Sequence, residues 1–453
     1  MKKAVNSYPS TKLGTGLLSV ISLVFVIQSL VFAGDVPQNV IFMIIDGCGF
    51  NHIAATSYYE YGKKGGQVYE KFPVKLAVST YPAGGSYNPK KAQKDFDYVK
   101  EGSTDSAAAA TALSTGVKTS IGAIGVDVSE KPVENVIEKC EKLGMATGVI
   151  TSVPFCHATP AGFVAHCEGR YKYSRIAEEM ISKSAAEVIF GCGHFLYDDD
   201  GKKLNGKTNS EFINSKELWD SIANGDVGAD ADGDGIADKW SLIQSRAEFV
   251  NLADGQTPKR VLGIAEAAST LQVNRHGESK MPFDVPFDQN VPTLAEMSSA
   301  ALNVLDNDPD GFFIMIEGGA VDWTSHGNNS IRMIEEMIDF ENAVKAVVEW
   351  VETKSSWDKT LVIITADHET GYLTGQNKAR LVANKGKGKM PAMEWQKTGH
   401  TNSLVGFFAK GAGAKSFIER AKNNDPVRGR YMDNTDIPKT IFQFLEDRKS
   451  QTE

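Results

Sequence analysis

Short runs of apolar and β-branched residues recur along the chain and predict buried strands. The seven runs are residues 39–45, 76–80, 147–151, 188–190, 312–316, 361–365 and 404–409. Between several of them the apolar residues follow a helical period, as they do over 133–143 and along a longer segment, 331–351. Alternating strands and helices favour a mostly parallel sheet with helices on both faces. The pattern therefore predicts an α/β fold, specifically a three-layer α/β/α sandwich.

The strand pattern fades over residues 195–285, where polar, Gly-rich and Asp-rich sequence takes over. We interpret this segment as a peripheral surface insertion within one catalytic domain of residues 36–447. An independently folded domain is the alternative. The 453 residues are 42% hydrophobic, so the chain is long enough for a large core.

The first residues have the features of a secretory signal peptide. Lys2, Lys3 and Lys12 precede an apolar run, 17–32, and small residues end at Ala33. We expect cleavage near Ala33 and export to the periplasm or medium, with an uncleaved membrane anchor as the alternative. Without residues 1–33, 45 basic residues face 57 acidic ones, a net charge of −12. This charge argues against a nucleic-acid partner, and we expect no stable membrane insertion after cleavage.

The five cysteines lack the CxxC spacing of a zinc ribbon or a redox site. An exported protein can form disulfides, and Cys156 with Cys167 is the first pair to test.

Carboxylates and imidazoles follow the predicted strands. In open α/β sheets, ligands bind beyond the carboxyl ends of the strands, so these side chains are expected at one edge. For a single histidine a structural hydrogen-bonding role is the alternative, but five separate clusters make coincidence a poor explanation. The candidates in chain order are Asp46, His157, Thr159, Arg170, Glu317, Asp322, His326, Asp367, His368 and His400.

These residue types and spacings suit metal ions. Asp322 and His326 lie four residues apart, and Asp367 and His368 are adjacent, so each pair can present oxygen and nitrogen to a Zn²⁺-like ion. His400 can complete one such site. Asp46 can complete the other, which gives two metal sites.

Ser106 is the candidate nucleophile. Four alanines follow it, and residues 102–105 form a loop with a capping residue, so the serine is expected in the first turn of a helix. Free N–H groups and the helix dipole favour an anion there. An ordinary alanine-rich packing helix is the alternative.

In these motifs the chain resembles the alkaline phosphatase family, exported metalloenzymes that hydrolyse phosphate monoesters. The resemblance runs from about Val40 to the final strand, and its Asp-Ser-Ala-Ala motif implies a phosphoserine intermediate at Ser106. It also implies a homodimer, and Arg170 as the residue that holds the phosphate. The implied ligands are Asp322, His326 and His400 for one Zn²⁺, Asp46, Asp367 and His368 with Ser106 for the other, and Asp46, Thr159 and Glu317 for Mg²⁺.

Two positions depart from well-known bacterial members, which carry Asp and Lys where this chain has His157 and Trp323. An imidazole beside the magnesium site removes a negative charge, so that ion is expected to be held less tightly. Trp323 cannot supply a lysine's charge to phosphate, although its indole N–H can donate a hydrogen bond. We therefore predict weaker binding of product phosphate.

Other functions are weighed against this resemblance. A metal-dependent phosphodiesterase on the same scaffold is one, although Arg170 favours a dianionic monoester. A sulfatase is disfavoured because alanines follow Ser106 in place of a Cys/Ser-x-Pro-x-Arg motif. A catalytically silent metal-binding surface protein is the third, and the complete ligand set argues against it.

The insertion carries a second metal signal. Acidic residues alternate and a glycine stands at the sixth position, which matches a calcium loop. Position twelve is Ser241 where an EF-hand has a bidentate Glu, so a solvated acidic turn is the alternative. The candidate Ca²⁺ ligands are Asp230, Asp232, Asp234, Ile236 and Asp238.

Overall fold

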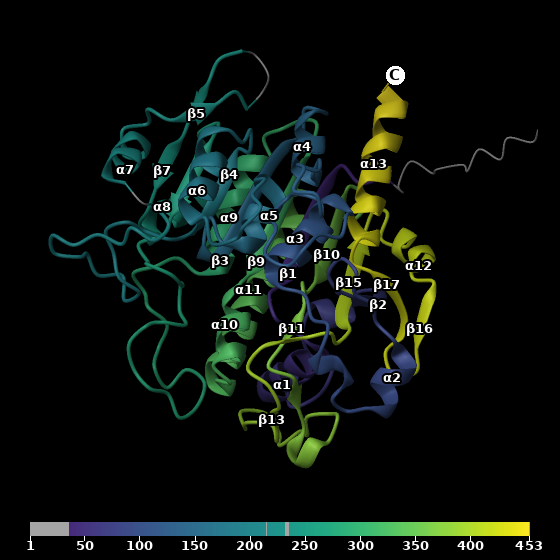
Figure 1. The fold of residues 1–453 in the computed structure, drawn as a ribbon. Helices are drawn as coiled ribbons and strands as arrows, with labels where there is room; N and C mark the ends of the chain where they lie inside the picture. Colours follow the sequence, from purple (N-terminus) through teal and green to yellow (C-terminus); the bar gives the residue numbers. More distant parts are fainter. Residues whose placement is uncertain (1–35, 214, 232–234, 453) are drawn as a thin grey trace, which may run out of the picture. The chain divides into compact units, whose positions relative to one another are not determined.

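An eleven-stranded sheet forms the centre of the computed structural model, which describes residues 36–213, 215–231 and 235–452 (Figure 1). In order across the sheet, the strands are β16 (Asn423–Asp425), β17 (Gly429–Asp433), β2 (Val74–Ser79), β15 (Val405–Gly411), β10 (Thr360–Thr365), β1 (Asn39–Ile45), β9 (Phe312–Gly318), β3 (Ala146–Pro154), β4 (Val188–Cys192), β8 (Val261–Ile264) and β7 (Ser241–Ile243). Strands β15 and β16 run antiparallel to their neighbours, and the other neighbouring pairs are parallel. The predicted mostly parallel sheet is confirmed.

The helices form two groups that pack among themselves. One group comprises α3 (Ser106–Thr115), α4 (Val136–Glu141), α5 (Ala158–Val164), α6 (Tyr173–Ser182), α12 (Ser416–Arg420) and α13 (Asp436–Thr452). The other comprises α1 (Phe50–Tyr61), α8 (Arg246–Asp254), α9 (Leu294–Leu305), α10 (Ala320–His326) and α11 (Ser330–Lys354). All seven residues of β1 are buried, which requires cover on both faces of the sheet. These layers are the predicted α/β/α sandwich.

Short elements complete the described chain. They are α2 (Pro89–Lys94), α7 (Lys216–Ala223), β5 (Gly228–Ala229), β6 (Asp238–Lys239), β11 (Glu369–Thr370), β12 (Leu373–Thr374), β13 (Glu394–Trp395), β14 (His400–Thr401) and the 3₁₀ turns η1 (Tyr69–Lys71), η2 (Tyr98–Lys100) and η3 (Gln376–Lys378).

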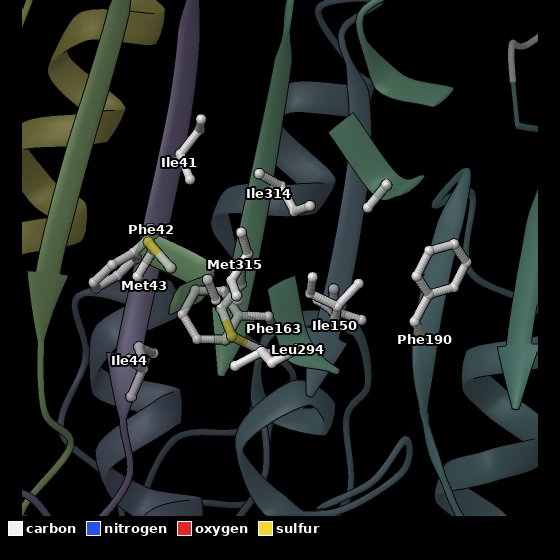
Figure 2. Packing of buried hydrophobic residues seen from close by; sticks show 14 of the residues in the cluster. Ile41, Phe42, Met43, Ile44, Ile150, Phe163, Phe190, Leu294, Ile314 and Met315 are labelled. Atoms are coloured by element: carbon white, nitrogen blue, oxygen red, sulfur yellow. The ribbon is translucent and has the colours of Figure 1, made fainter. Parts of the chain in front are cut away.

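Aromatic and branched side chains from neighbouring strands fill the core between sheet and helices (Figure 2). Phe163 of α5 packs edge-on against Phe42 of β1, with ring centroids 5.8 Å apart, and stacks on Phe313 of β9 at 6.2 Å. These rings hold α5 against the centre of the sheet, and α5 follows directly on the loop that carries His157.

All seven predicted runs are strands, and both helical patterns are helices. The first helix, α4, begins only at Val136 because Asn135 caps it: Glu138 N–H donates to Asn135 Oδ1, and Asn135 N–H donates to Glu138. Strands β7, β8, β16 and β17 were not predicted: β7 has only three residues, β16 is short and polar, and β8 and β17 each carry a glycine.

The polar segment that begins near residue 195 supplies β7 and β8, which extend the sheet beyond β4. Arg260 precedes β8 and lies buried, with its guanidinium 3.8 Å from the Trp240 ring centroid and hydrogen bonded to the carbonyls of Ala186 and Ser184. The insertion is therefore tied to the sheet by main-chain pairing and by a buried cation.

The predicted signal peptide lies outside the described residues. Among the residues that are described, no helix is both long enough and apolar enough to span a bilayer. The five cysteines are all buried free thiols, so the pair Cys156 and Cys167 is not bonded.

Candidate active site

The predicted site residues converge at the carboxyl ends of four neighbouring strands, β10, β1, β9 and β3. Asp46 follows β1, Asp367 and His368 follow β10, Glu317 lies near the end of β9, and His157 follows β3. Parallel strands end at the same edge, which explains why residues so far apart in the sequence meet.

A glycine permits the closest approach between two of these segments. Gly47 has φ of +75°, and a Cβ at this position would lie 2.8 Å from Asp322 Cα. A larger residue would therefore separate the loop after β1 from α10. The glycine brings Asp46 beside the candidate ligands of α10.

Ser106 is the first residue of α3 and is 1% exposed. Asp105 caps the helix, because its Oδ1 accepts hydrogen bonds from the N–H groups of Ala108 and Gly122, both at 3.1 Å. The Ser106 Oγ lies 3.2 Å from His368 Nε2. The alanines also pack: a Cβ on Gly162 of α5 would come within 2.7 Å of the Ala110 Cβ. The serine is thus held at a helix N-terminus by close packing of α3 on α5.

Asp46, Asp367 and His368 form one group of possible metal ligands, with ligand atoms within 4.8 Å of one another. All three are fully buried. Asp367 Oδ1 accepts from the N–H groups of Gly47 and His368, at 3.1 and 2.8 Å. Asp367 Oδ2 and both oxygens of Asp46 have no hydrogen-bond partner among the described residues, although His368 Nε2 lies 3.1 Å from Asp367 Oδ2 and 3.5 Å from Asp46 Oδ1. Buried acceptors without donors are costly, and a cation is the partner that fits them.

Asp322, His326 and His400 come together as predicted. His326 Nε2 lies 3.3 Å from Asp322 Oδ2, and His400 Nε2 lies 3.5 Å from Asp322 Oδ1. The ligand atoms of Asp322 and His400 also lie within 4.8 Å of His368, so the two groups adjoin.

The hydrogen bonds on the far side of each ring fix which nitrogen is unprotonated. Nδ1–H of His326 donates to the Thr398 carbonyl at 2.5 Å, and Nδ1–H of His400 donates to the Thr104 carbonyl at 2.9 Å. When the rings are neutral both Nε2 atoms carry lone pairs, yet they lie 3.0 Å apart. Their repulsion is relieved either by a shared proton, which Asp322 favours by raising the pKa of both rings, or by a metal ion. This tautomer pattern is typical of metal-ligating histidines.

Thr370 links the two groups. Its hydroxyl donates to Asp322 Oδ1 at 2.5 Å and lies 3.3 Å from His368 Nδ1. Because the hydroxyl proton is used by Asp322, the remaining lone pair accepts from His368 Nδ1–H. His368 Nε2 is then also left unprotonated and faces Ser106.

Glu317 and Thr159, the predicted magnesium ligands beside Asp46, are fully buried. Thr151 donates to Glu317 Oε2 at 2.5 Å, whereas Glu317 Oε1 and Thr159 Oγ1 have no partner among the described residues. Burial, with Asp367 and Asp322 nearby, raises the pKa of Glu317 to about 7. Burial also raises the pKa of Asp46 well above its ordinary range, and that of Asp367 to about 6. Positive charge is what this cluster lacks, so the residues present fit divalent cations.

Arg170 lies at the wall of the same pocket, which has a volume of about 780 Å³ and is lined by Ser106, His157, Trp323, His326 and His400 among others. Its Nη1 donates to Asp105 Oδ2 at 3.0 Å, and its buried Nε has no partner. A planar guanidinium with free donors beside a hydroxyl can bind two oxygens of a phosphate.

The sequence of this chain matches a family model. The model described as alkaline phosphatase matches residues 37–390. The chain belongs to the alkaline phosphatase family. The resemblance inferred from the motifs is thereby confirmed.

Individual relatives agree with this assignment. Alkaline phosphatase 3 of Bacillus subtilis is 30% identical over 74% of this chain, and alkaline phosphatase of Escherichia coli is 30% identical over 73%. The alignments span 62% and 70% of those two proteins, so this chain covers somewhat less than two thirds of the first. A crystal structure of a cold-active alkaline phosphatase from Shewanella sp. has a TM-score of 0.65 and 25% identity, covering 90% of this chain and 99% of that one.

Several contacts at the site were not predicted from the sequence. Thr370 follows the predicted ligands by two residues, but a threonine carries no ligand signal of its own. The carbonyls of Thr104 and Thr398 orient two histidines. Every residue has such a carbonyl, so the residue types do not indicate which ones make this contact. A capping residue was expected within residues 102–105, but the contact of Asp105 with Arg170 was not.

The predicted calcium loop is only partly described, since Asp232 and Asp234 lie outside the described residues. Its ends meet where β5 pairs with β6. Asp238 Oδ2 accepts from Ala231 N–H, and Asp238 Oδ1 lies 2.8 Å from Lys259 Nζ. Asp230 accepts from Gly235 N–H at 2.9 Å.

Proposed function

We propose that this chain is a metal-dependent phosphomonoesterase that works through a covalent phosphoserine at Ser106. The arrangement that carries this proposal is the convergence of three imidazole Nε2 atoms and several carboxylate oxygens without hydrogen-bond partners around one buried hydroxyl. Family membership supports the same chemistry.

The candidate ligand residues form three groups, each of which would hold one metal ion. Asp322, His326 and His400 would hold one Zn²⁺, and Asp46, Asp367 and His368 with Ser106 the other. Asp46, Thr159 and Glu317 would hold Mg²⁺, with His157 nearby. Bound there, these ions would lower the pKa of the serine hydroxyl and stabilise charge on the leaving oxygen. The possible Ca²⁺ ligands of the insertion are a separate proposal.

The protein's own groups then have defined tasks. Arg170 binds two phosphate oxygens, and Asp105 fixes the orientation of its guanidinium. Ser106 Oγ attacks phosphorus as its proton passes to solvent water, the bond from phosphorus to the ester oxygen breaks, and the alkoxide takes one proton from solvent and departs as the alcohol. Water then attacks the phosphoserine, the bond from phosphorus to Oγ breaks, and phosphate leaves as the serine regains a proton.

We extend the proposal to the whole chain. Residues 1–33 would serve as a cleaved signal that sends the protein to the periplasm or medium. Residues 36–447 would form one catalytic domain with its insertion at about 195–285, and the mature protein would be a homodimer that acts on small phosphate monoesters. Light scattering and N-terminal sequencing of the exported protein test assembly and cleavage.

The central experiment measures release of p-nitrophenol from p-nitrophenyl phosphate. Wild type is expected to be active and to lose activity on chelation, and Ser106→Ala is expected to lose at least about a thousandfold. Ser120→Ala, an exposed serine outside the pocket, is the matched control. Acid quenching during turnover should leave phosphate on the peptide that contains Ser106.

Chelator-resistant release, or normal release by Ser106→Ala, would contradict the mechanism. Faster turnover of bis-p-nitrophenyl phosphate than of the monoester would make the chain a diesterase.

A further inference from the structure

Four aromatic rings form a row beside Arg170, and three of them, those of Trp323, His157 and Tyr171, line the pocket. The Trp323 and His157 rings meet edge-on at 5.7 Å, His157 stacks on Tyr173 at 6.2 Å, and Tyr173 meets Tyr171 edge-on at 6.3 Å. The row connects α10, the loop after β3 and the segment leading into α6. Its last ring, Tyr171, stands at the pocket mouth.

Two large apolar side chains of this mouth are left in water. Tyr171 is 78% exposed and Ile121 is 64% exposed, and both line the pocket that contains Ser106. The other exposed large apolar side chains of the described residues, Val128 among them, do not line it. A single exposed apolar residue is ordinary, but two at the rim of one polar pocket indicate a contact surface.

Tyr171 stands close to the proposed phosphate position. The guanidinium carbon of Arg170 lies 5.6 Å from the centroid of the Tyr171 ring. A phosphate bound to Arg170 would therefore lie near this ring. An aromatic ring close to that phosphate can stack on Tyr171.

The charges around the mouth argue for a neutral ring rather than a cationic group. Glu168 is the carboxylate that lines the mouth near Tyr171. It forms ion pairs with Lys172 and, at 2.9 Å, with Arg175. With Arg170 adjacent, a positively charged leaving group would meet more cations than free carboxylates.

We propose that Tyr171 and Ile121 form a leaving-group subsite that selects phosphate monoesters whose alcohol carries an aromatic ring close to the phosphate. This inference rests on the proposed function, because it assumes that phosphate is held by Arg170 next to Ser106. It concerns only the choice of substrate, so the reaction and its proton balance are unchanged.

The test compares benzyl phosphate with ethyl phosphate. Both release a primary alkoxide, so they differ chiefly in the ring. Tyr171→Ala is expected to lower kcat/KM for benzyl phosphate about 5- to 10-fold and to leave ethyl phosphate within about twofold. Tyr171→Phe should keep the preference because it keeps the ring. Ile121→Ala should lower it about threefold, with the exposed Val128→Ala as matched control.

Calorimetric binding of benzylphosphonate and ethylphosphonate repeats the comparison without turnover. Wild type should bind benzylphosphonate more tightly, and Tyr171→Ala should remove most of the difference. Phosphocholine should gain nothing from Tyr171.

Equal losses for the benzyl and ethyl compounds in Tyr171→Ala would overturn the subsite while leaving the phosphatase intact. Selective loss for phosphocholine would overturn it in favour of a cation site. Wild-type protein that releases phosphate from neither ester would contradict the proposed function, and the phosphonate comparison would still decide the subsite.

Discussion

Two groups of buried charge in this molecule differ in one respect: where the balancing charge comes from. Glu335 of α11 is completely buried, and its oxygens accept from Arg275 at 2.7 Å, Arg332 at 3.2 Å and Phe283 N–H at 2.6 Å. We call Glu335, Arg275 and Arg332 the Glu335 cluster. Every charge in it has a partner from the protein.

The carboxylates at the strand ends are as deeply buried but lack such partners. Asp46 has no donor on either oxygen, and Asp367 and Glu317 each have one oxygen without a donor among the described residues. We call these three the site carboxylates. Burial alone therefore does not reveal function. A buried carboxylate that the protein itself neutralises holds the fold together, whereas several carboxylates without partners, gathered beside imidazole nitrogens, indicate a cation from solution.

The largest effect is expected at the Glu335 cluster. Glu335→Ala leaves two buried guanidinium groups without their carboxylate and should lower the free energy of unfolding by about 3–5 kcal/mol. Guanidinium chloride unfolding measures this loss, and Glu349→Ala, an exposed glutamate on the same helix, should cost less than about 0.5 kcal/mol. Added Zn²⁺ should not restore stability. Restoration by Zn²⁺ would show that this cluster also depends on metal.

The site carboxylates should behave in the opposite way. Wild type is expected to gain about 2.7 kcal/mol of stability at a metal concentration one hundred times the Kd. Asp367→Asn should lower metal affinity about 100-fold, so that the gain at the same concentration falls below about 0.5 kcal/mol. The metal-free variant should be at least as stable as metal-free wild type, since it removes an unneutralised buried charge.

Thermal unfolding with and without chelator measures both quantities, and the exposed Asp358→Asn is the matched control. A metal-free Asp367→Asn protein less stable than wild type would mean that the fold itself needs this carboxylate.

A third group of buried carboxylates consists of two residues near the amino ends of β3 and β4, and it extends the comparison to pH. Burial raises the pKa of Glu187 to about 8 and that of Glu141 to about 7, although Thr147 donates to both. The folded state thus binds protons that the unfolded state releases above pH 4.5. The resulting stability is complete below about pH 4.5 and is lost as the pH rises through 8.

Between pH 5 and pH 8 wild type should therefore lose roughly 2 kcal/mol more than Glu187→Gln, which cannot ionise. Unfolding midpoints of the two proteins at each pH, under equal metal, isolate this difference. A constant difference across the range would show that Glu187 is already ionised in the folded protein.

The sequence predicted the parts of the fold and site that depend on residue type. Apolar β-branched runs located the central strands, because strands covered on both faces require them. Asp46, His368 and the other candidate ligands were noticed because carboxylates and imidazoles are uncommon directly after such strands. Strand β8 was missed, since Gly263 interrupts its four residues and its anchor, Arg260, is polar.

What the sequence could not predict is the balance of charge. In the sequence, Glu335 and Asp367 are both simply acidic residues, and only the positions of Arg275 and Arg332 in the structure distinguish the two carboxylates. Likewise, the orientations of the His326 and His400 rings follow from main-chain carbonyls, which every residue has. These features depend on three-dimensional contacts between distant segments.

Thr370 gives a smaller effect within the site. Thr370→Val removes the hydroxyl that donates to Asp322 and accepts from His368, so metal affinity should fall about tenfold. Thr370→Ser should restore it, which a packing role would not explain. Metal titration measures the change, and Thr374→Val, a buried threonine that bonds to main-chain carbonyls, is the control. An unchanged affinity would mean that Asp322 and His368 are oriented without this hydroxyl.

The smallest effect is expected when a positive charge is added to the active site at Trp323. Trp323 lines the pocket and offers phosphate only an indole N–H. Trp323→Lys adds a positive charge that the protein itself supplies, as Arg275 and Arg332 do in the Glu335 cluster. The inhibition constant for inorganic phosphate should fall about fivefold, an effect that weakens as ionic strength rises. Trp323→Phe removes the N–H without adding charge and should not lower that constant. If the lysine variant did not bind phosphate more tightly, charge at this position would not limit product binding.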